Sequence, residues 1–431
     1  YCRRFRIVCF FNKIFNYQEE KFNTYKILKL KILGISFKIK LLNKINNNID
    51  TKELLDFLYS SDNKDFVKIT KYPYVKNEKD TKLIAFYLPQ FHTIPLNDKY
   101  IEHGFTEWTN VTKIQPQFLG HYQPHLPIDV GFYDLSTDKV MYRQIELAKM
   151  YGIYGFCFHY YWFSGGKRLL ETPLFNYLNN KELDLPFALC WANETWAKQW
   201  DGGNKEIMME QKFSCEDCDK FFYDILPFIK DNRYIKINNK PLLCIYNPKL
   251  FKDNEITYLV KRLRELAKEN GFEDLYIIGA RVFGNTDSTV YGMDASVEFY
   301  PNGHENLKEI DITGKIINKK FMSKVFDMED AVYNRKFMPE VNYPLYKTVF
   351  PYWDNSARKA FQGGWVFQTA PALYKKWLKD VIEWTKKNHN KDKQFVFINA
   401  WNEWAEGAHL EPDRKFGYAY LEATKEALEE S

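Results

Sequence analysis

Two glutamates, Glu403 and Glu406, stand three residues apart near the carboxyl end of the chain, with Trp401 before them and Trp404 between them. A helical turn at this point would put both carboxyl groups on one side. Two carboxylates at one site repel each other, and burial beside tryptophan raises the pKa of the less solvated group. One can then act as an acid and the other as a base at neutral pH. A close pair of this kind suits cleavage of a glycosidic bond with retention of configuration.

The same spacing also fits a structural role for the two glutamates. Carboxylates in the exposed first turn of a helix interact favourably with the helix dipole and need no catalytic function. On spacing alone this interpretation is the more common one. The pair directly follows the apolar run 395–400 and is flanked by tryptophans, and this position favours a catalytic site.

Other polar and aromatic side chains gather where the expected strands end. Tryptophan and tyrosine beside carboxylates suggest a sugar ligand, because the C–H faces of sugar rings pack on aromatic rings while carboxylates and amides bind the hydroxyls. Taken singly, each aromatic residue is equally well explained by core packing, so the clustering is the signal. Besides the catalytic pair, the expected substrate-binding residues are His92, Glu107, Trp108, Tyr122, His159, Tyr160, Trp191, Asn193, Glu194, Trp196, Arg281, Glu298, Asp354, Arg358, Trp401, Asn402 and Trp404.

Eight short apolar runs alternate with longer amphipathic stretches after residue 82, a pattern typical of βα units. Strands buried on both faces with helices between them predict an α/β fold, a (β/α)8 TIM-type barrel, in which functional groups collect where strands end. An open doubly wound sheet is the alternative, disfavoured because no strand is followed by a GxGxxG or GxxxxGK[ST] turn. The expected strands are 83–88, 155–159, 187–191, 242–246, 276–280, 295–299, 348–352 and 395–400.

Three helices between these strands have recognisable ends or stripes. Ser136 is expected to cap a helix that stops at Gly152, and Asp253 to cap one that closes at Gly271. Residues 373–385 carry an apolar stripe at helical spacing.

Positive charge is concentrated at the amino end. The first fifty residues carry eleven Lys and Arg against three acidic residues, a local charge of +8, whereas the whole chain carries +5. The remainder, at about −3, argues against a nucleic-acid-binding surface, although the basic end could contact an anionic membrane surface. We expect residues 1–80 to be a basic extension, with a strand hairpin around Gly34 and a linker, and residues 81–431 to be the catalytic barrel.

The composition of the 431 residues, 45% hydrophobic and 18% aromatic, predicts a large core and excludes a disordered or collagen-like chain. Seven cysteines, several inside apolar runs, indicate a reducing compartment. No window has the roughly 18 uninterrupted apolar residues of a transmembrane helix, and no secretory segment is visible. We therefore expect a cytoplasmic location with membrane association through the basic end, although a signal upstream of Tyr1 would lie outside this sequence. The lone CxxC of Cys215 and Cys218 lacks partner ligands, so no metal site is expected.

Several spaced motifs resemble one protein family. They are IAFYLPQFH at 84–92, GFTEWTNV at 104–111, HYQP at 121–124, WANE at 191–194 and NAWNEWAEG at 399–407. On these motifs the sequence from about 82 to 430 resembles the WbsX-like proteins of bacterial surface-polysaccharide biosynthesis clusters. Those proteins form a group similar to glycoside hydrolase family 99.

The resemblance implies a (β/α)8 enzyme similar to an endo-acting, retaining α-mannosidase. By resemblance, Glu403 is the base that helps the substrate's own 2-hydroxyl attack the anomeric carbon, which gives a 1,2-anhydro sugar. Glu406 is the general acid that protonates the leaving oxygen. The implied substrate is an oligosaccharide or polysaccharide, such as a lipopolysaccharide chain or its precursor, and no metal or cofactor is implied.

Three functions stay open at this point. The first is a retaining glycoside hydrolase or transglycosylase, in which Trp404→Ala is expected to weaken glycan binding with the fold intact. The second is a glycosyltransferase of O-antigen or capsule biosynthesis, although the Asp-x-Asp at 217–219 fits a solvated helix cap better than a metal site. The third is a non-catalytic glycan-binding module. The sequence does not indicate an oligomeric state.

Overall fold

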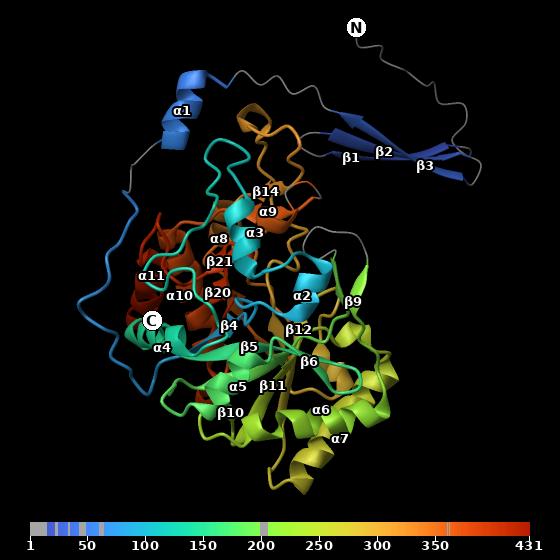
Figure 1. Cartoon of the computed structure of the whole chain (residues 1–431), viewed down its shortest axis with the longest axis vertical. Helices are drawn as coiled ribbons and strands as arrows, with labels where there is room; N and C mark the ends of the chain where they lie inside the picture. The colour runs from blue at the N-terminus through green and yellow to red at the C-terminus, as the bar shows by residue number, and fades with distance from the viewer. Residues whose placement is uncertain are drawn as a thin grey trace.

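A computed structural model describes residues 15–21, 25–32, 35–42, 49–59, 64–198, 206–359, 361 and 363–431. Most of the described chain forms one barrel of parallel strands surrounded by helices (Figure 1). The expected (β/α)8 TIM-type barrel is therefore confirmed.

The barrel strands follow one another around the barrel in chain order. They are β4 (Lys82–Tyr87), β5 (Ile153–Phe163), β7 (Phe187–Trp191), β11 (Lys240–Ile245), β12 (Tyr276–Arg281), β13 (Ala295–Glu298), β15 (Leu345–Tyr346), β16 (Thr348–Val349) and β19 (Phe395–Ile398). The sheet closes through the seventh segment, because β15 pairs with β13 and β16 pairs with β19. Each neighbouring pair in this circuit is parallel, so the carboxyl ends of the strands meet at one rim.

All eight expected strands overlap observed ones, and the largest differences concern two of them. β5 continues to Phe163 because its outer end pairs with β6 (Lys167–Leu169) in a hairpin. The seventh strand begins at Leu345 and is interrupted at Lys347, whose carbonyl still accepts the N–H of Phe397 at 3.0 Å. Short apolar runs thus located the strands, while their ends depend on pairing partners that the local sequence does not show.

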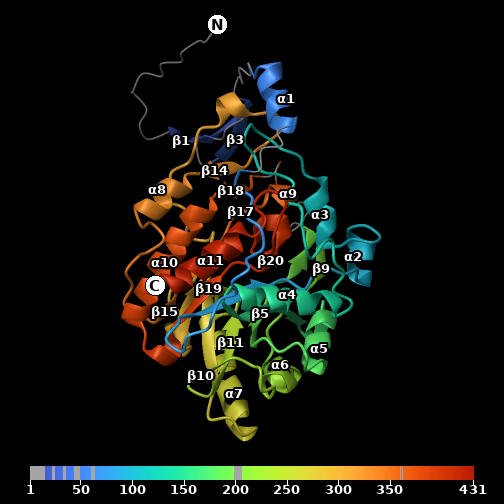
Figure 2. The ribbon, with the colours of Figure 1, turned by 90° about the vertical axis from the view of Figure 1, so that its left-hand side faces the viewer.

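Helices cover the outside of the barrel (Figure 2). Each buries an apolar stripe, as in α7, where Ile256, Leu259 and Leu263 recur at helical spacing and are buried. The expected stripe at 373–385 lies within α10. The longer helices are α4 (Lys139–Met150), α5 (Thr172–Asn179), α6 (Cys215–Ile229), α7 (Asp253–Glu269), α10 (Pro371–Asn388) and α11 (Ala419–Glu429).

Two of the expected helix caps are wrong. The N-cap of α4 is Asp138, and the backbone N–H of Ser136 instead donates to Asp134 Oδ1 at 2.7 Å in the preceding turn. Asp253 is the first residue of α7, whereas Lys252 is the N-cap and donates its N–H to Glu255 Oε2 at 2.9 Å. In α4 the nearby carboxylate of Asp134 serves the preceding turn, whereas in α7 the carboxylate of Glu255 takes part in the cap.

Short elements fill the connections between strands and helices. Those near the carboxyl-end rim matter most for the site described below. They are α2 (Pro95–Tyr100), α3 (Glu107–Lys113), β8 (Trp196–Ala197), β9 (Ile207–Met209), β17 (Trp353–Asp354), α9 (Ser356–Lys359), β20 (Asn402–Glu403), η6 (Trp404–Glu406) and β21 (Ala408–His409). The remaining ones are β10 (Lys236–Ile237), η2 (Pro248–Leu250), η3 (Ser288–Tyr291), η4 (Thr313–Lys315), β14 (Lys324–Phe326), α8 (Met328–Tyr333), β18 (Trp365–Phe367) and η5 (Lys391–Lys393).

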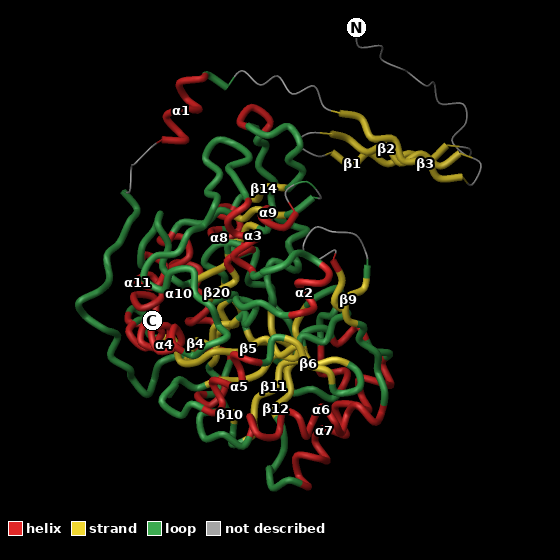
Figure 3. Tube along the Cα trace, viewed as in Figure 1, coloured by secondary structure: helices red, strands yellow, loops and turns green. Residues whose placement is uncertain are grey.

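The amino-terminal region has its own elements: β1 (Phe15–Lys21), β2 (Tyr25–Ile32), β3 (Ile35–Leu42) and α1 (Thr51–Tyr59). The three strands form an antiparallel sheet, and β2 and β3 flank the expected hairpin position, although Gly34 itself and residues 1–14 lie outside the described part. After α1 the chain runs along the barrel as a long loop before β4 begins (Figure 3). Within the described residues, no helix has the length and apolar character needed to cross a bilayer.

Candidate active site

A cavity of about 180 Å³ opens at the carboxyl ends of the barrel strands. Its walls combine carboxylates, one guanidinium, an imidazole and aromatic rings. The sequence-predicted residues that line it are Glu107, His159, Glu194, Trp196, Arg358, Glu403 and Glu406.

The two glutamates of the pair lie in a tight hairpin directly after β19. β20 pairs with β21, and the single 3-10 turn η6 connects them, so the expected helical turn after the strand is a 3-10 turn. Gly407 ends this turn with φ of 63°, a left-handed conformation that favours glycine. Any other residue would place a Cβ 3.2 Å from the backbone nitrogen of Asp354. Because glycine has no Cβ, the turn can pack closely on the segment that contains Asp354.

Arg358, on α9, contacts three carboxylates at once. Its Nη2 lies 2.9 Å from Glu403 Oε1 and 2.8 Å from Glu107 Oε2. Its Nη1 lies 2.9 Å from Glu406 Oε1. Because the guanidinium is a rigid planar fork, this one side chain holds both members of the pair and Glu107 in a fixed relation.

Negative charge exceeds positive charge around Glu403. Burial raises the pKa of Glu403 well above its ordinary value, Arg358 lowers it in part, and the neighbouring Glu406 and Glu107 raise it further. Glu403 is buried, whereas Glu406 is partly exposed toward the cavity. The two carboxyl groups therefore have different environments, and such a difference is what assigns acid and base roles to a pair.

Glu194, in the loop after β7, and His159, on the neighbouring strand β5, line the same cavity. Asn247 donates to Glu194 Oε1 at 3.1 Å, and Asn193 in turn holds Asn247 through bonds of 2.9 and 2.8 Å to its carbonyl and N–H. Burial raises the pKa of Glu194 and lowers that of His159 to about 4. The cavity thus offers a neutral imidazole and an oriented carboxyl group, both able to bind sugar hydroxyls. Asn193 supports this arrangement from outside the cavity.

Aromatic rings also line the cavity. Tyr161 and Trp196 lie with centroids 5.5 Å apart at an interplanar angle of 30°. Tyr246 and Phe299 meet edge to face at 5.0 Å. Flat apolar faces beside hydrogen-bonding groups are the combination that sugar rings require.

The tryptophans near the pair do not line the cavity. Trp401 and Trp404 are buried behind the hairpin, and their indole N–H groups donate to Glu411 at 3.1 and 2.6 Å. The ring of Trp404 also stacks on that of His409, with centroids 3.7 Å apart, and packs on that of Trp108, with centroids 5.6 Å apart. These side chains support the backbone that carries Glu403 and Glu406. Trp404 therefore lies in the core, whereas the sequence predicted that it would contact the glycan.

Asn402 and Asp354 also act from behind the cavity. Asn402 Oδ1 accepts the N–H of Leu88 at 2.7 Å and its Nδ2 donates to the Leu88 carbonyl at 3.0 Å, which joins the hairpin to the end of β4. Asp354 contacts His121 Nε2 at 2.6 Å and accepts from Gln123 at 2.9 Å. Although burial opposes it, His121 and these hydrogen bonds lower the pKa of Asp354. Asp354 thereby fixes the segment that leads into α9 and Arg358.

The remaining predicted residues lie away from the cavity. Two of them face outward from the barrel, because side chains alternate along a strand. The hydroxyl of Tyr160 donates to Asp224 on α6. The ring of Trp191 packs on that of Phe221, also on α6, with centroids 4.2 Å apart. Glu298 accepts a hydrogen bond from Lys347 at 2.8 Å, and Arg281 lies 3.6 Å from the same carboxylate. The ring of Tyr122 stacks on that of His125, with centroids 4.0 Å apart. Buried His92 contacts the carbonyl oxygen of Thr93 at 3.1 Å.

Some cavity residues were missed. For Tyr161 a signal existed, because His159 faces the cavity and a residue two positions along the same strand faces the same side. Tyr246 and Phe299 ended expected strands as single aromatic residues, which core packing explains equally well. The missed residues are Leu88, Gln90, Tyr161, Ala192, Tyr246, Phe299 and Asn399.

Comparisons with known proteins identify relatives of this chain. Residues 83–424 match the family described as Glycosyltransferase WbsX. Two proteins from strains of Xanthomonas campestris pv. campestris, both called uncharacterized protein WxcX, are 41% and 40% identical over 346 residues, which is 80% of this chain and 49% of each relative. The chain therefore spans about half the length of these curated relatives.

Two solved structures match this chain at low sequence identity. A glycoside hydrolase-like protein matches with a TM-score of 0.53 and 15% identity, over 85% of this chain and 98% of that one. A GH99 endo-alpha-mannosidase from Bacteroides thetaiotaomicron matches with a TM-score of 0.49 and 14% identity, over 83% and 98% of the two chains.

Fold and site together define a class of protein. It is the class of (β/α)8 barrels whose cavity, at the carboxyl ends of the strands, combines paired carboxylates with aromatic faces. Within that class, the chain belongs to the Glycosyltransferase WbsX family, whose model covers most of its length. The resemblance expected from the sequence motifs is thereby confirmed.

Proposed function

We propose that the protein is a retaining glycoside hydrolase or transglycosylase that acts on a bacterial surface polysaccharide or its precursor. The observation that carries this proposal is the pair Glu403 and Glu406, held by Arg358 at one cavity. The aromatic wall supports it, because Tyr161 and Trp196 offer faces on which a sugar ring can pack. A carboxyl pair flanking one sugar is the arrangement that glycosidic cleavage uses.

In the proposed reaction Glu403 takes the proton of the substrate's 2-hydroxyl, whose oxygen attacks the anomeric carbon. Glu406 gives its proton to the leaving oxygen, and the product is a 1,2-anhydro sugar. Water or a second sugar hydroxyl then opens this ring, with the two glutamates exchanging roles. The base role of Glu403 follows the family resemblance, and its raised pKa means that its carboxylate, once formed, holds a proton more strongly than an ordinary one. The partial exposure of Glu406 supports the acid role, because water can restore its proton.

A nucleotide-sugar glycosyltransferase is the second candidate, and the description of the family favours it. Such an enzyme must bind a diphosphate, which in proteins is done by Arg, Lys or a metal ion. Among the described residues that line the cavity, Arg358 is the one Lys or Arg, and three carboxylates already contact it. This charge balance favours a neutral sugar over a diphosphate as the occupant.

The decisive experiment compares wild type, Glu403→Gln and Glu406→Gln on α- and β-linked aryl glycosides and on glycosyl fluorides, beginning with mannose. Fluoride leaves without protonation. Glu406→Gln should therefore lose about 10²–10⁴-fold on aryl glycosides with poor leaving groups but keep turnover of the fluoride. Glu403→Gln should lose both activities. NMR of the first-formed product should show the retained anomer.

Glu305→Gln, which changes an exposed glutamate outside the cavity, is the matched control, and thermal melting shows whether each variant is folded. Full activity of both site variants would contradict the assigned roles. No turnover of the panel together with transfer from a nucleotide sugar would indicate a glycosyltransferase. Equal glycan binding by all variants without turnover would indicate a binding module.

A further inference from the structure

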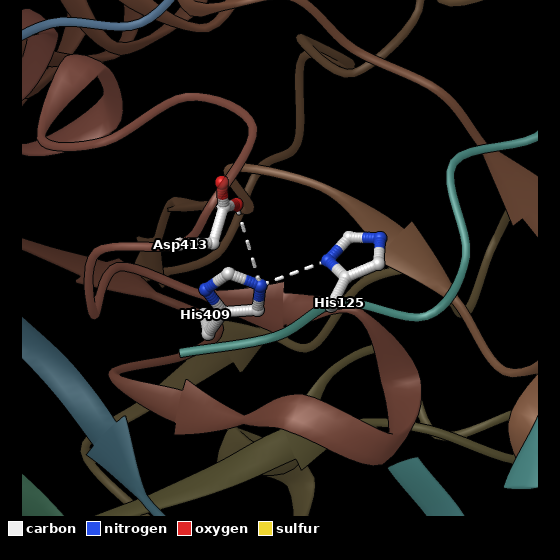
Figure 4. A group of neighbouring side chains, drawn as sticks. All are labelled: His125, His409 and Asp413. Atoms are coloured by element: carbon white, nitrogen blue, oxygen red, sulfur yellow. Dashed lines mark hydrogen bonds and ion pairs between the residues drawn. The ribbon is translucent and has the colours of Figure 1, made fainter. Parts of the chain in front are cut away.

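A second cluster of functional side chains lies outside the cavity. His125, His409 and Asp413 are each nine-tenths buried or more and converge on one point (Figure 4). His125 Nδ1 lies 2.8 Å from His409 Nε2, and this same nitrogen lies 3.8 Å from Asp413 Oδ2. One donor atom from each residue lies within 4.8 Å of the other two. The proposed catalytic reaction uses none of the three.

The orientation of His409 decides which atom it presents to the cluster. Its Nδ1 lies 2.8 Å from the carbonyl oxygen of Glu411, which can only accept, so Nδ1 carries the hydrogen. Its Nε2 therefore presents a lone pair to His125 and Asp413.

Asp413 is oriented in a similar way. Its Oδ1 accepts the backbone N–H groups of Lys415 and Phe416 at 2.8 and 2.6 Å, and its Oδ2 faces His409. A carboxylate fixed by backbone amides and an imidazole fixed by a backbone carbonyl are the outer contacts typical of metal ligands. Lys415, whose Nζ lies 4.6 Å from the centre of the Tyr122 ring, is the competing cation near Asp413.

We propose that His125, His409 and Asp413 bind one zinc ion. Two imidazole nitrogens and a carboxylate oxygen are a donor set that zinc accepts, and a water molecule can complete four-coordination. Zinc–nitrogen bonds of about 2.0–2.1 Å put two ligand nitrogens roughly 3.3 Å apart in a tetrahedral site. The two rings therefore need to separate only slightly to admit the ion.

The ion would tie the catalytic hairpin to a distant segment. His409 lies in β21 directly opposite Asn402, the neighbour of Glu403, and stacks on Trp404. His125 belongs to the segment between β4 and α4. The zinc would therefore have a structural role at the back of the hairpin, and this role stands independently of the proposed glycosidase activity.

The test uses the full chain, freed of metal with a chelator and titrated with zinc sulfate in a calorimeter. Wild type should bind one zinc ion per chain and gain thermal stability on binding. His125→Gln and His409→Gln should lose the binding. Three matched controls should keep it: His103→Gln, which changes an exposed imidazole, Cys215→Ser, which removes the exposed thiol of the CxxC, and Lys415→Met, which removes the competing cation.

Cobalt binding to the wild type gives a second readout that does not depend on the folding of any variant. Visible bands of tetrahedral cobalt with nitrogen and oxygen ligands, without a sulfur-to-cobalt band, support the proposed ligands. A sulfur band, or zinc binding kept by both histidine variants, would assign the metal to other residues and overturn the proposal. Metal-free wild type that binds neither zinc nor cobalt would show that His125 and His409 share a hydrogen bond instead.

Discussion

The protonation of Glu403 determines how the proposed reaction depends on pH. Burial raises the pKa of Glu403 well above its ordinary value near 4.3–4.5, and Arg358 lowers it in part. A base acts only when ionised, so kcat/KM should rise with pH through this raised pKa. Arg358→Met removes the lowering influence and should move the rising limb to still higher pH. The measurement is the pH dependence of kcat/KM on an activated glycoside.

The control for this prediction is Arg335→Met, which changes an exposed arginine outside the cavity and should leave the profile unchanged. The direction in which kcat/KM changes with pH distinguishes a base from an acid. If kcat/KM falls as pH rises through the pKa of Glu403, then Glu403 is the acid and the roles of the pair are reversed.

At the residue scale, the sequence located the carboxylates better than the aromatic rings. Glu403 and Glu406 could be predicted because they follow an apolar strand and are flanked by tryptophans, a position that favours a site over an exposed helix turn. The link from Arg358 to both of them and to Glu107 joins three segments far apart in the chain, so it appears only in the structure. Aromatic rings carry no such mark, because the same ring packs a core or lines a cavity.

At the scale of elements, two tryptophans near the site have different roles: one packs in the core and the other lines the cavity. Trp404, in η6, is buried, stacks on His409 and donates to Glu411, so it belongs to the support of the hairpin. Trp196, in β8, is half-buried and lines the cavity. We therefore replace the expectation that Trp404→Ala weakens glycan binding while leaving the fold intact.

Trp404→Ala should cost about 3–5 kcal/mol of the free energy of unfolding, because it leaves a large hole in the core. Trp196→Ala should leave the melting temperature nearly unchanged and weaken glycan binding by about 2-fold to 10-fold, the value of one aromatic contact. Thermal denaturation and calorimetric glycan titration of both variants, side by side, measure the two effects. Equal melting temperatures for the two variants would contradict the support role of Trp404.

Element boundaries were harder to predict than the elements themselves. All eight strands were expected because buried parallel strands are continuous apolar runs. The caps of α4 and α7 were misplaced because Ser136 and Asp253 are both residue types that cap helices, and the choice among neighbouring candidates depends on the backbone turn. The hydrogen bond from Ser136 to Asp134 is a turn contact that the local sequence permits equally well.

At the scale of the whole molecule, the segment before β4 bears on where the folded barrel unit begins. The loop before β4 is tied to the barrel by backbone hydrogen bonds. Val67 donates to Phe416 at 3.1 Å and accepts from Tyr418 at 2.9 Å, and Tyr74 donates to Met150 at 2.8 Å. We therefore propose that the folded unit begins near residue 64, ahead of the expected boundary at 81.

Two shortened chains test this boundary. A chain that begins at residue 64 keeps these contacts and should match the full chain in melting temperature and in activity. A chain that begins at residue 81 loses at least three hydrogen bonds worth about 0.5–1.5 kcal/mol each, together with the packing of Tyr74 on the core, and should melt several degrees lower. Because β4 begins at Lys82, both chains keep every barrel strand, so the difference between them reports the loop alone. Equal melting temperatures of the two shortened chains would return the boundary to residue 81.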